Sequence, residues 1–188
     1  PGGSVYGVSE LATEIMKART QKPVVAVANS LAASAAYWIG CAAGEFYVTP
    51  GGEVGSIGVW QAHFDYSKAL EDEGVKPTLI SAGKFKVEGN PYVPLDLEAL
   101  SFMQSRVDDY YNAFAKAVAK GRGLTVNDVR EGMGEGRVLG ADAALAAKMV
   151  DGVATFDEVL AKMQKTARSA QPVGASRLKQ ARAALALI

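Results

Sequence analysis

The spacing of hydrophobic and polar positions in the first fifty residues predicts alternating helices and strands. Apolar residues recur at helical spacing over 9–18, and the β-favouring run at 23–28 predicts a buried strand. A helix at 34–43 and a strand at 45–49 then repeat this order. Such alternation is typical of an α/β domain with a mostly parallel sheet flanked by helices.

The pattern after residue 50 is less regular and ends in one long helix. Strands are expected at 54–60 and 76–81, with a short helix at 66–73 between them. A polar loop at 82–94 leads to the longest periodic segment, 95–120. The wide apolar stripe of that segment indicates core packing or a subunit interface.

Shorter helices are predicted nearer the C-terminus. Thr125 and Asp128 have the spacing of a capping box at the start of one of them. Two further helices are expected at 141–148 and 156–165. Residues 1–165 are therefore expected to form one domain.

The two ends of the chain differ from this domain. The residues at 166–188 are basic and rich in alanine, which predicts a helical tail. The chain begins with Pro1-Gly2-Gly3 and reads as the middle of a loop, so upstream strands are expected to precede it.

The composition of the 188-residue chain excludes several classes of function. Lys plus Arg and Asp plus Glu each total 20, so no net charge attracts nucleic acid. Cys41 is the only cysteine, which excludes an internal disulfide and predicts a small core residue. With His63 as the only histidine, no multi-histidine metal site can form, and no metal or cofactor is expected.

An uncharged run of 22 residues, 23–44, contains the main chemical candidate, Ser34. The run is long enough to span a membrane, but its polar centre and many Ala and Gly residues favour a buried strand followed by a buried helix. Ser34 stands at the start of that helix. It either caps the helix or acts as a nucleophile beside free N–H groups that stabilise an oxyanion.

A nucleophilic serine needs a base, and the residues offer two kinds. His63, with Asp65 nearby, would complete a Ser-His-Asp triad. Lys84 or Lys86 would serve only if neutral, which requires burial that lowers a lysine pKa from about 10.4 toward 7. We expect such burial from a cleft roofed by the aromatic side chains of Trp60, Phe85 and Tyr92.

Three motifs resemble the signal peptide peptidase A family of serine–lysine peptidases. The run 29–39, Asn-Ser-Leu-Ala-Ala-Ser-Ala-Ala-Tyr-Trp-Ile, is similar to the nucleophile motif of that family. Gly-Ser-Ile-Gly-Val at 55–59 matches its second motif, and Pro1-Gly2-Gly3 resembles the end of its oxyanion loop. The segment 86–92, Lys-Val-Glu-Gly-Asn-Pro-Tyr, is similar to the phage branch of the family, the lambda-type capsid-assembly proteases.

The resemblance implies a ClpP/crotonase-type fold and a role for five residues. Ser34 would be the nucleophile and Lys86 the general base, with the hydroxyl of Ser56 orienting Lys86. The backbone amides of Gly3 and Ala35 would form the oxyanion hole. Within this resemblance His63 is expected to have a structural role.

The function implied is a serine endopeptidase that forms an acyl-enzyme during phage head maturation. Its partners would be unfolded or peptide substrates, capsid scaffold or portal proteins, and further copies of the chain in a homo-oligomer. It would act in the host cytoplasm or the procapsid. The alternatives are a bacterial membrane-associated peptidase that degrades signal peptides, a crotonase-type acyl-CoA enzyme and an inactive structural member of an assembly.

Overall fold

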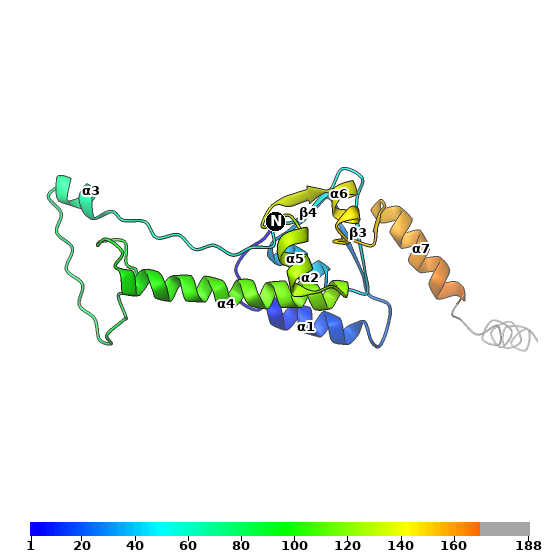
Figure 1. Ribbon diagram of the computed structural model, residues 1–188, viewed down its shortest axis with the longest axis horizontal. Helices are drawn as coiled ribbons and strands as arrows, with labels where there is room; N and C mark the ends of the chain where they lie inside the picture. Colours follow the sequence, from blue (N-terminus) through cyan, green and yellow to red (C-terminus); the bar gives the residue numbers. More distant parts are fainter. Residues whose placement is uncertain (170–188) are drawn as a thin grey trace, which may run out of the picture.

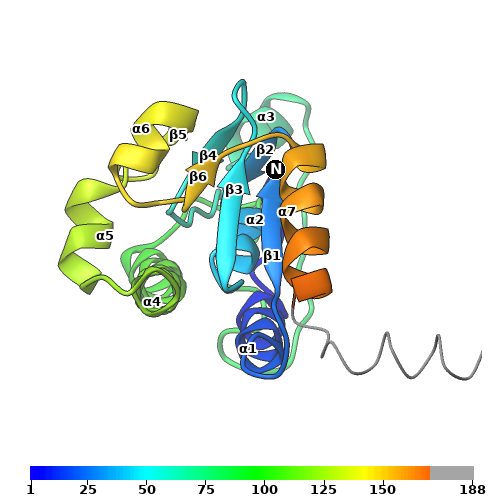
Figure 2. The same ribbon diagram turned by 90° about the vertical axis from the view of Figure 1, so that its right-hand side faces the viewer.

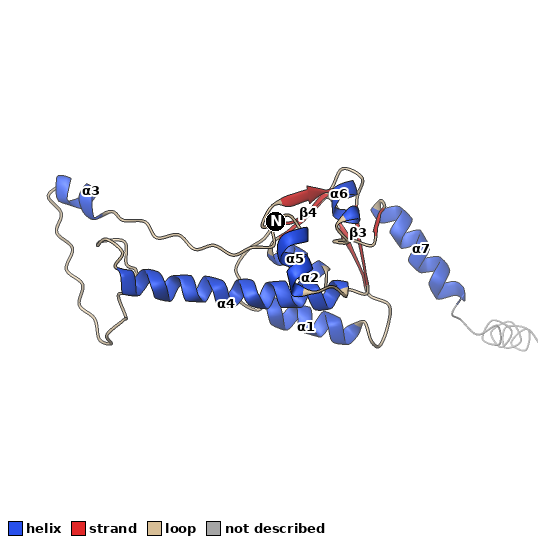
Figure 3. Ribbon diagram, viewed as in Figure 1, coloured by secondary structure: helices blue, strands red, loops and turns tan. Residues whose placement is uncertain are grey.

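Two three-stranded sheets form the centre of the protein, in a computed structural model that describes residues 1–169 (Figures 1 and 3). The strands are β1 Val25–Ala28, β2 Leu31–Ala33, β3 Glu45–Val48, β4 Glu53–Gly55, β5 Val138–Gly140 and β6 Gly152–Val153. The helices are α1 Val8–Ala18, α2 Ala35–Gly40, α3 Ser67–Asp72, α4 Leu97–Arg122, α5 Val126–Gly132, α6 Ala141–Ala146 and α7 Phe156–Ser169.

The two sheets differ in strand direction. The first has the order β1-β3-β6 and is parallel throughout. The second has the order β2-β4-β5, in which β2 and β4 are parallel and β5 is antiparallel. In the parallel pair Ala33 lies opposite Gly55, so the chain leaves both strands at the same edge.

Helices cover both faces of the first sheet, as the alternation of side chains along β3 requires (Figure 2). Phe46 and Val48 are buried on one face, where the Phe46 ring lies 5.7 Å from that of Tyr37 in α2. Glu45 points to the other face and accepts a hydrogen bond from Lys162 of α7. This bond, with a second from Tyr47, holds the pKa of Glu45 below its usual value.

Helices α2 and α4 approach each other closely in the core. The rings of Trp38 and Phe114 stack with centroids 4.7 Å apart. A Cβ on Gly121 would lie 2.3 Å from the carbonyl oxygen of Cys41, so only glycine permits this contact. Cys41 is fully buried, and burial raises the pKa of its thiol to about 12, which confirms the prediction of a core residue.

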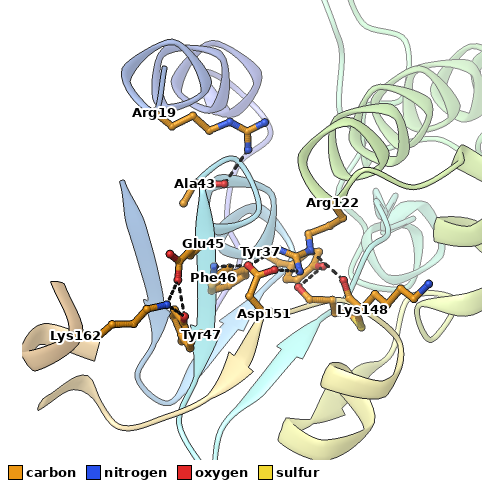
Figure 4. Close-up of polar contacts among 11 residues, drawn as sticks. Arg19, Tyr37, Ala43, Glu45, Phe46, Tyr47, Arg122, Lys148, Asp151 and Lys162 are labelled. Atoms are coloured by element: carbon orange, nitrogen blue, oxygen red, sulfur yellow. Dashed lines mark hydrogen bonds and ion pairs between the residues drawn. The ribbon is translucent and has the colours of Figure 1, made fainter. Parts of the chain in front are cut away.

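A charged pair joins the end of α4 to the turn before β6 (Figure 4). The guanidinium of Arg122 donates two hydrogen bonds of 2.8 Å to Asp151, which also accepts one from the backbone amide of Phe46. Burial alone would raise the pKa of Asp151, but the hydrogen bonds from Arg122 and Phe46 outweigh it and lower the pKa. The pair therefore fastens the long helix to the first sheet.

One long segment, residues 59–96, extends away from the rest of the structure and is called the arm. It runs beside α4 and carries α3 at its far end, to the left in Figure 1. Helix α3 contains no buried residue. The apolar side chains of the arm are largely exposed, including Ile80 at 96%.

Most predicted elements are present, and the differences concern short strands. The expected strand at 76–81 is absent from the described residues, and that at 54–60 shortens to β4. The helix predicted from 34 is preceded by β2, which the sequence pattern did not indicate. The capping box of Thr125 and Asp128 is confirmed.

The predicted tail at 166–188 falls mostly outside the described part of the chain. Residues 166–169 continue α7, and the rest lies beyond residue 169. Within residues 1–169 no helix is long and apolar enough to cross a membrane.

Candidate active site

Ser34 links β2 to α2 in a backbone conformation that residues other than glycine rarely adopt. Its φ is 53° and its ψ is −123°. The position is fixed on both sides, because its amide donates to the Gly55 carbonyl at 2.8 Å and its carbonyl accepts from the Trp38 amide at 3.0 Å. Such strained backbone positions cluster at functional sites. Ser34 occupies the N-cap position, yet its side chain makes no capping hydrogen bond, which argues against the cap interpretation.

Ser56 directly follows β4, as Ser34 directly follows β2. Ala33 and Gly55, the last residues of these two parallel strands, are paired, so the two serines come next at the same edge of the sheet. Ser56 also has a φ of 53°. Its amide donates to the carbonyl of Arg137 at 2.7 Å. Both serines therefore follow strands that end at the same edge of the second sheet.

The N-terminal loop closes over Ser34. A Cβ on Gly2 would lie 2.5 Å from the Cβ of Ser34 and 2.8 Å from its hydroxyl oxygen, so the loop passes as closely as glycine allows. Gly3 has open space around its α-carbon. The family resemblance implies an oxyanion role for Gly3 and does not single out Gly2, because a close approach between distant segments leaves no local pattern.

A cavity of about 80 Å³ lies beside Ser34. Gly3 and Ala35, the two residues expected to supply oxyanion amides, both line it. The aromatic side chains of Trp38 and Phe114 line it as well. Four of the five predicted site residues thus belong to one small region: three line the cavity, and Ser56 is next to Ser34 in register.

Lys86 does not join this region within one copy of the chain. Its neighbour Lys84 contacts Glu98, at the start of α4, with a distance of 3.5 Å between Nζ and Oε1. The cavity beside Ser34 is lined by Phe114, 16 residues further along the same helix. At 1.5 Å per residue this separation is about 24 Å.

The triad alternative is not assembled either. The Nε2 of His63 makes a hydrogen bond of 3.0 Å with the carbonyl oxygen of Asn90. The carboxylate of Asp65 accepts hydrogen bonds from Ser67, which lower its pKa. His63 lies near the start of the arm, and this hydrogen bond connects it to Asn90 near the end of the arm, which is a structural role.

The expected cleft around the lysine is also absent from a single copy. Trp60 is 84% exposed, and Phe85 and Tyr92 are about half-exposed, so these three rings do not roof a common cleft. Lys86 itself is exposed. The prediction of a desolvated lysine within one chain is wrong, because the arm extends outward instead of folding over Ser34.

The polar groups near Ser34 offer acyl-transfer chemistry and no metal site. Hydroxyls and backbone amides are the groups that attack a carbonyl and stabilise an oxyanion. Among residues 1–169, no group of three or more His, Cys, Asp or Glu side chains is placed to hold a metal ion.

Two phage proteins are among the relatives. The chain is 37% identical over 164 residues to capsid assembly protease C of Escherichia phage lambda, which covers 87% of this chain and 37% of that protein. It is 40% identical over 129 residues to head-tail preconnector protein GP5 of Enterobacteria phage P21, covering 69% of this chain and 26% of that protein. The chain therefore spans about a third of the length of these relatives.

A solved structure has the same fold. A serine-to-alanine mutant of the 1510-N membrane-bound stomatin-specific protease superposes with a TM-score of 0.51 at 19% identity, over 86% of this chain and 64% of the other. This match supports the expected ClpP/crotonase-like α/β fold. The model of peptidase family S49 matches residues 16–170, and the chain therefore belongs to peptidase family S49.

Proposed function

We propose that the protein is a serine endopeptidase that cleaves peptide bonds with a Ser34–Lys86 dyad. The observation that carries the proposal is the strained, uncapped Ser34 beside a cavity lined by Gly3 and Ala35. Membership of peptidase family S49 supports the same reaction class. A serine used only as a helix cap would not need this backbone conformation.

The reaction needs a group that takes the proton of Ser34. In our proposal its hydroxyl oxygen attacks the scissile carbonyl carbon while the neutral amine of Lys86 accepts the proton. The amides of Gly3 and Ala35 stabilise the oxyanion. Lys86 then gives the proton to the leaving amine, and a water molecule hydrolyses the acyl-enzyme by the same proton path.

The lysine must come from a second copy of the chain. The start of α4, near Lys86, and the Ser34 cavity are about 24 Å apart along α4. The arm exposes a row of apolar side chains that a neighbouring copy would cover, including those of Phe64, Ile80 and Phe85. Ser56 would then orient the incoming amine, because it follows the strand that pairs with the one before Ser34. A closed homo-oligomer supplies each Ser34 with a neighbour's Lys86.

A fluorophosphonate probe tests the nucleophile. We expect covalent labelling of the parent protein at Ser34 and none of Ser34→Ala, with unchanged thermal unfolding because no hydrogen bond is lost. Ser30→Ala is the matched control in the same run and should label like the parent. Labelling of Ser34→Ala, or equal cleavage of casein by that variant, would remove Ser34 from the role.

A pair of glycine variants tests the oxyanion loop. Gly2→Ala should lower kcat by about 10²-fold, the cost of misplacing an oxyanion donor, because the new methyl group collides with Ser34. Gly3→Ala keeps its amide and has open space, so it should stay within a few-fold of the parent. Equal rates for the two variants would contradict the proposed loop position.

For the biological role we propose the processing of capsid or scaffold proteins during phage head assembly. The support is the names of the two phage relatives, a capsid assembly protease and a head-tail preconnector protein. Cleavage of unfolded casein with little cleavage of a folded protein would agree with this role, which would place the protein in the host cytoplasm or procapsid.

A further inference from the structure

Hydrogen bonds, more than packing, hold the loop of the arm that carries Lys86. Residues 83–90 form consecutive turns. The amide of Lys86 donates to the carbonyl of Gly83 at 3.1 Å, and the amide of Asn90 donates to that of Val87 at 3.2 Å. A cavity of about 260 Å³ lies between this loop and the start of α4. Because the loop has open space on that side, packing there cannot fix its position.

Asn90 makes several of the bonds that shape this loop. Its side-chain amide donates to the carbonyl of Val87 at 2.8 Å, in addition to the bond from its backbone amide. Its side-chain oxygen accepts from the amide of Tyr92 at 3.0 Å. Since Val87 directly follows Lys86, the position of Asn90 constrains the backbone of Lys86.

His63 fastens Asn90 to the outgoing side of the arm, residues 59–66. The Nε2 of His63 lies 3.0 Å from the carbonyl oxygen of Asn90. A carbonyl oxygen only accepts, so Nε2 carries the hydrogen and donates it. A second bond between the two sides runs from the amide of Tyr66 to the carbonyl of Pro91 at 2.8 Å. Both of its partners are backbone groups, so the contribution of His63 can be removed by itself.

We propose that His63 is a positioning residue for Lys86, which acts through Asn90 to hold the lysine-bearing loop in the place from which its amine reaches Ser34 of a neighbouring copy. The inference rests on the proposed Ser34–Lys86 dyad and adds a residue to it. His63 itself takes no proton from the serine. A base on a loosened loop spends less time within hydrogen-bond distance of the hydroxyl, which lowers kcat.

Two variants separate the hydrogen bond of His63 from its bulk. His63→Gln keeps an N–H donor at about the reach of Nε2, whereas His63→Leu has a similar size and no donor. We expect His63→Leu to lower kcat about tenfold, the worth of one hydrogen bond. KM should stay unchanged, because neither His63 nor the Lys86 loop lines the cavity beside Ser34. His63→Gln should recover most of the lost kcat.

A variant elsewhere in the arm is the control. Lys68→Met removes the exposed ion pairs of Lys68 with Glu71 and Asp72 in α3, at the far end of the arm. It leaves the bond between His63 and Asn90 in place, so kcat should match that of the parent.

A double mutant tests whether His63 acts through Asn90. Asn90→Asp keeps the backbone carbonyl that His63 binds but loses the side-chain donor to Val87. Once that link is weakened, adding His63→Leu should lower kcat by much less than tenfold. Losses that simply multiply would overturn the inference.

Hydrogen exchange follows the loop independently of catalysis. The amides of Lys86 and Asn90 should exchange faster in His63→Leu than in the parent or in His63→Gln. Exchange in His63→Leu at the parent rate would overturn the inference. An equal loss of kcat in both His63 variants would also overturn it, since the imidazole itself would then take part in the reaction.

Lys86→Ala distinguishes a failure of this inference from a failure of the proposed dyad. Full activity of Lys86→Ala would remove the lysine from the reaction, whatever His63 does to the loop. An inactive Lys86→Ala beside a fully active His63→Leu would mean that the dyad is correct and that His63 does not position it.

Discussion

The arm and the body of the protein, which is the rest of residues 1–169, bury apolar residues to very different extents, although helix α4 of the body borders both. In the C-terminal half of α4, Phe114, Ala115 and Val118 are almost completely buried. In its first turns, beside the arm, Leu97 is 82% exposed and Phe102 56% exposed. The apolar stripe is continuous in sequence, but only half of it finds a partner in the same chain.

The difference is what the proposed contact between copies of the chain would require of the arm. Contiguous exposed apolar surface commonly marks an interaction site. The same arm carries Lys86, whereas Ser34 lies in the body. In the proposed dyad the base on the arm would reach Ser34 of another copy, so oligomer formation would complete the proposed site.

The largest expected effect comes from two separate variants, one that removes the nucleophile of the body and one that removes the expected base of the arm. Ser34→Ala in the body and Lys86→Ala in the arm should each lower kcat by about 10⁴-fold or more. A one-to-one mixture that exchanges subunits should regain about a quarter of parent activity, because a quarter of shared sites then have both native groups. Lys84→Ala is the control and should remain active. A mixture without activity, despite subunit exchange, would contradict a dyad shared between copies.

The same truncation in the two regions should affect folding unequally. Phe114→Ala removes a buried ring that stacks on Trp38 and should lower the free energy of unfolding by about 3–5 kcal/mol. Phe64→Ala, whose ring is 63% exposed, should leave chemical unfolding of the isolated chain nearly unchanged. Its effect should instead appear in sedimentation, as weaker self-association. A large loss of stability in Phe64→Ala would mean that the arm folds back in solution.

A smaller effect is expected from the charged pair of the body. Asp151→Asn leaves Arg122 without its counter-charge and should cost about 2 kcal/mol at pH 7, less than a fully buried pair because Asp151 is partly exposed. The folded protein lowers the pKa of Asp151, so its contribution is present above about pH 4. It is lost as the pH falls through the lowered value.

Urea unfolding of both proteins checks this dependence on pH. The difference between the parent and Asp151→Asn should shrink below about pH 4, where the parent carboxylate takes up a proton. The arm offers the control, since Glu73→Gln changes an exposed carboxylate and should leave unfolding at pH 7 unchanged. A difference that grows on acidification would have the wrong sign for a lowered pKa.

The sequence by itself determined the α/β class, most helices and the candidate nucleophile. Periodic apolar spacing predicts α1, α4 and α7 because each must bury one face, and the capping box at Thr125 is a local hydrogen-bond pattern. Ser34 stood out because a polar residue interrupts a long uncharged run. The assignment of Lys86 came from resemblance to a family, since its spacing from Lys84 could not choose between the two.

Only the tertiary structure decided the neighbours of these residues. The strand β2 has three residues, too few for a periodic signal, yet its pairing with β4 makes Ser34 and Ser56 follow strands that end at the same edge. The close approach of Gly2 and the hydrogen bond between His63 and Asn90 depend on segments that are distant in sequence. The course of the arm could not be predicted from the sequence either, because the sequence does not distinguish an apolar residue that is exposed from one that is buried. Burial is a property of what surrounds a side chain, and those surroundings are decided only when the chain folds.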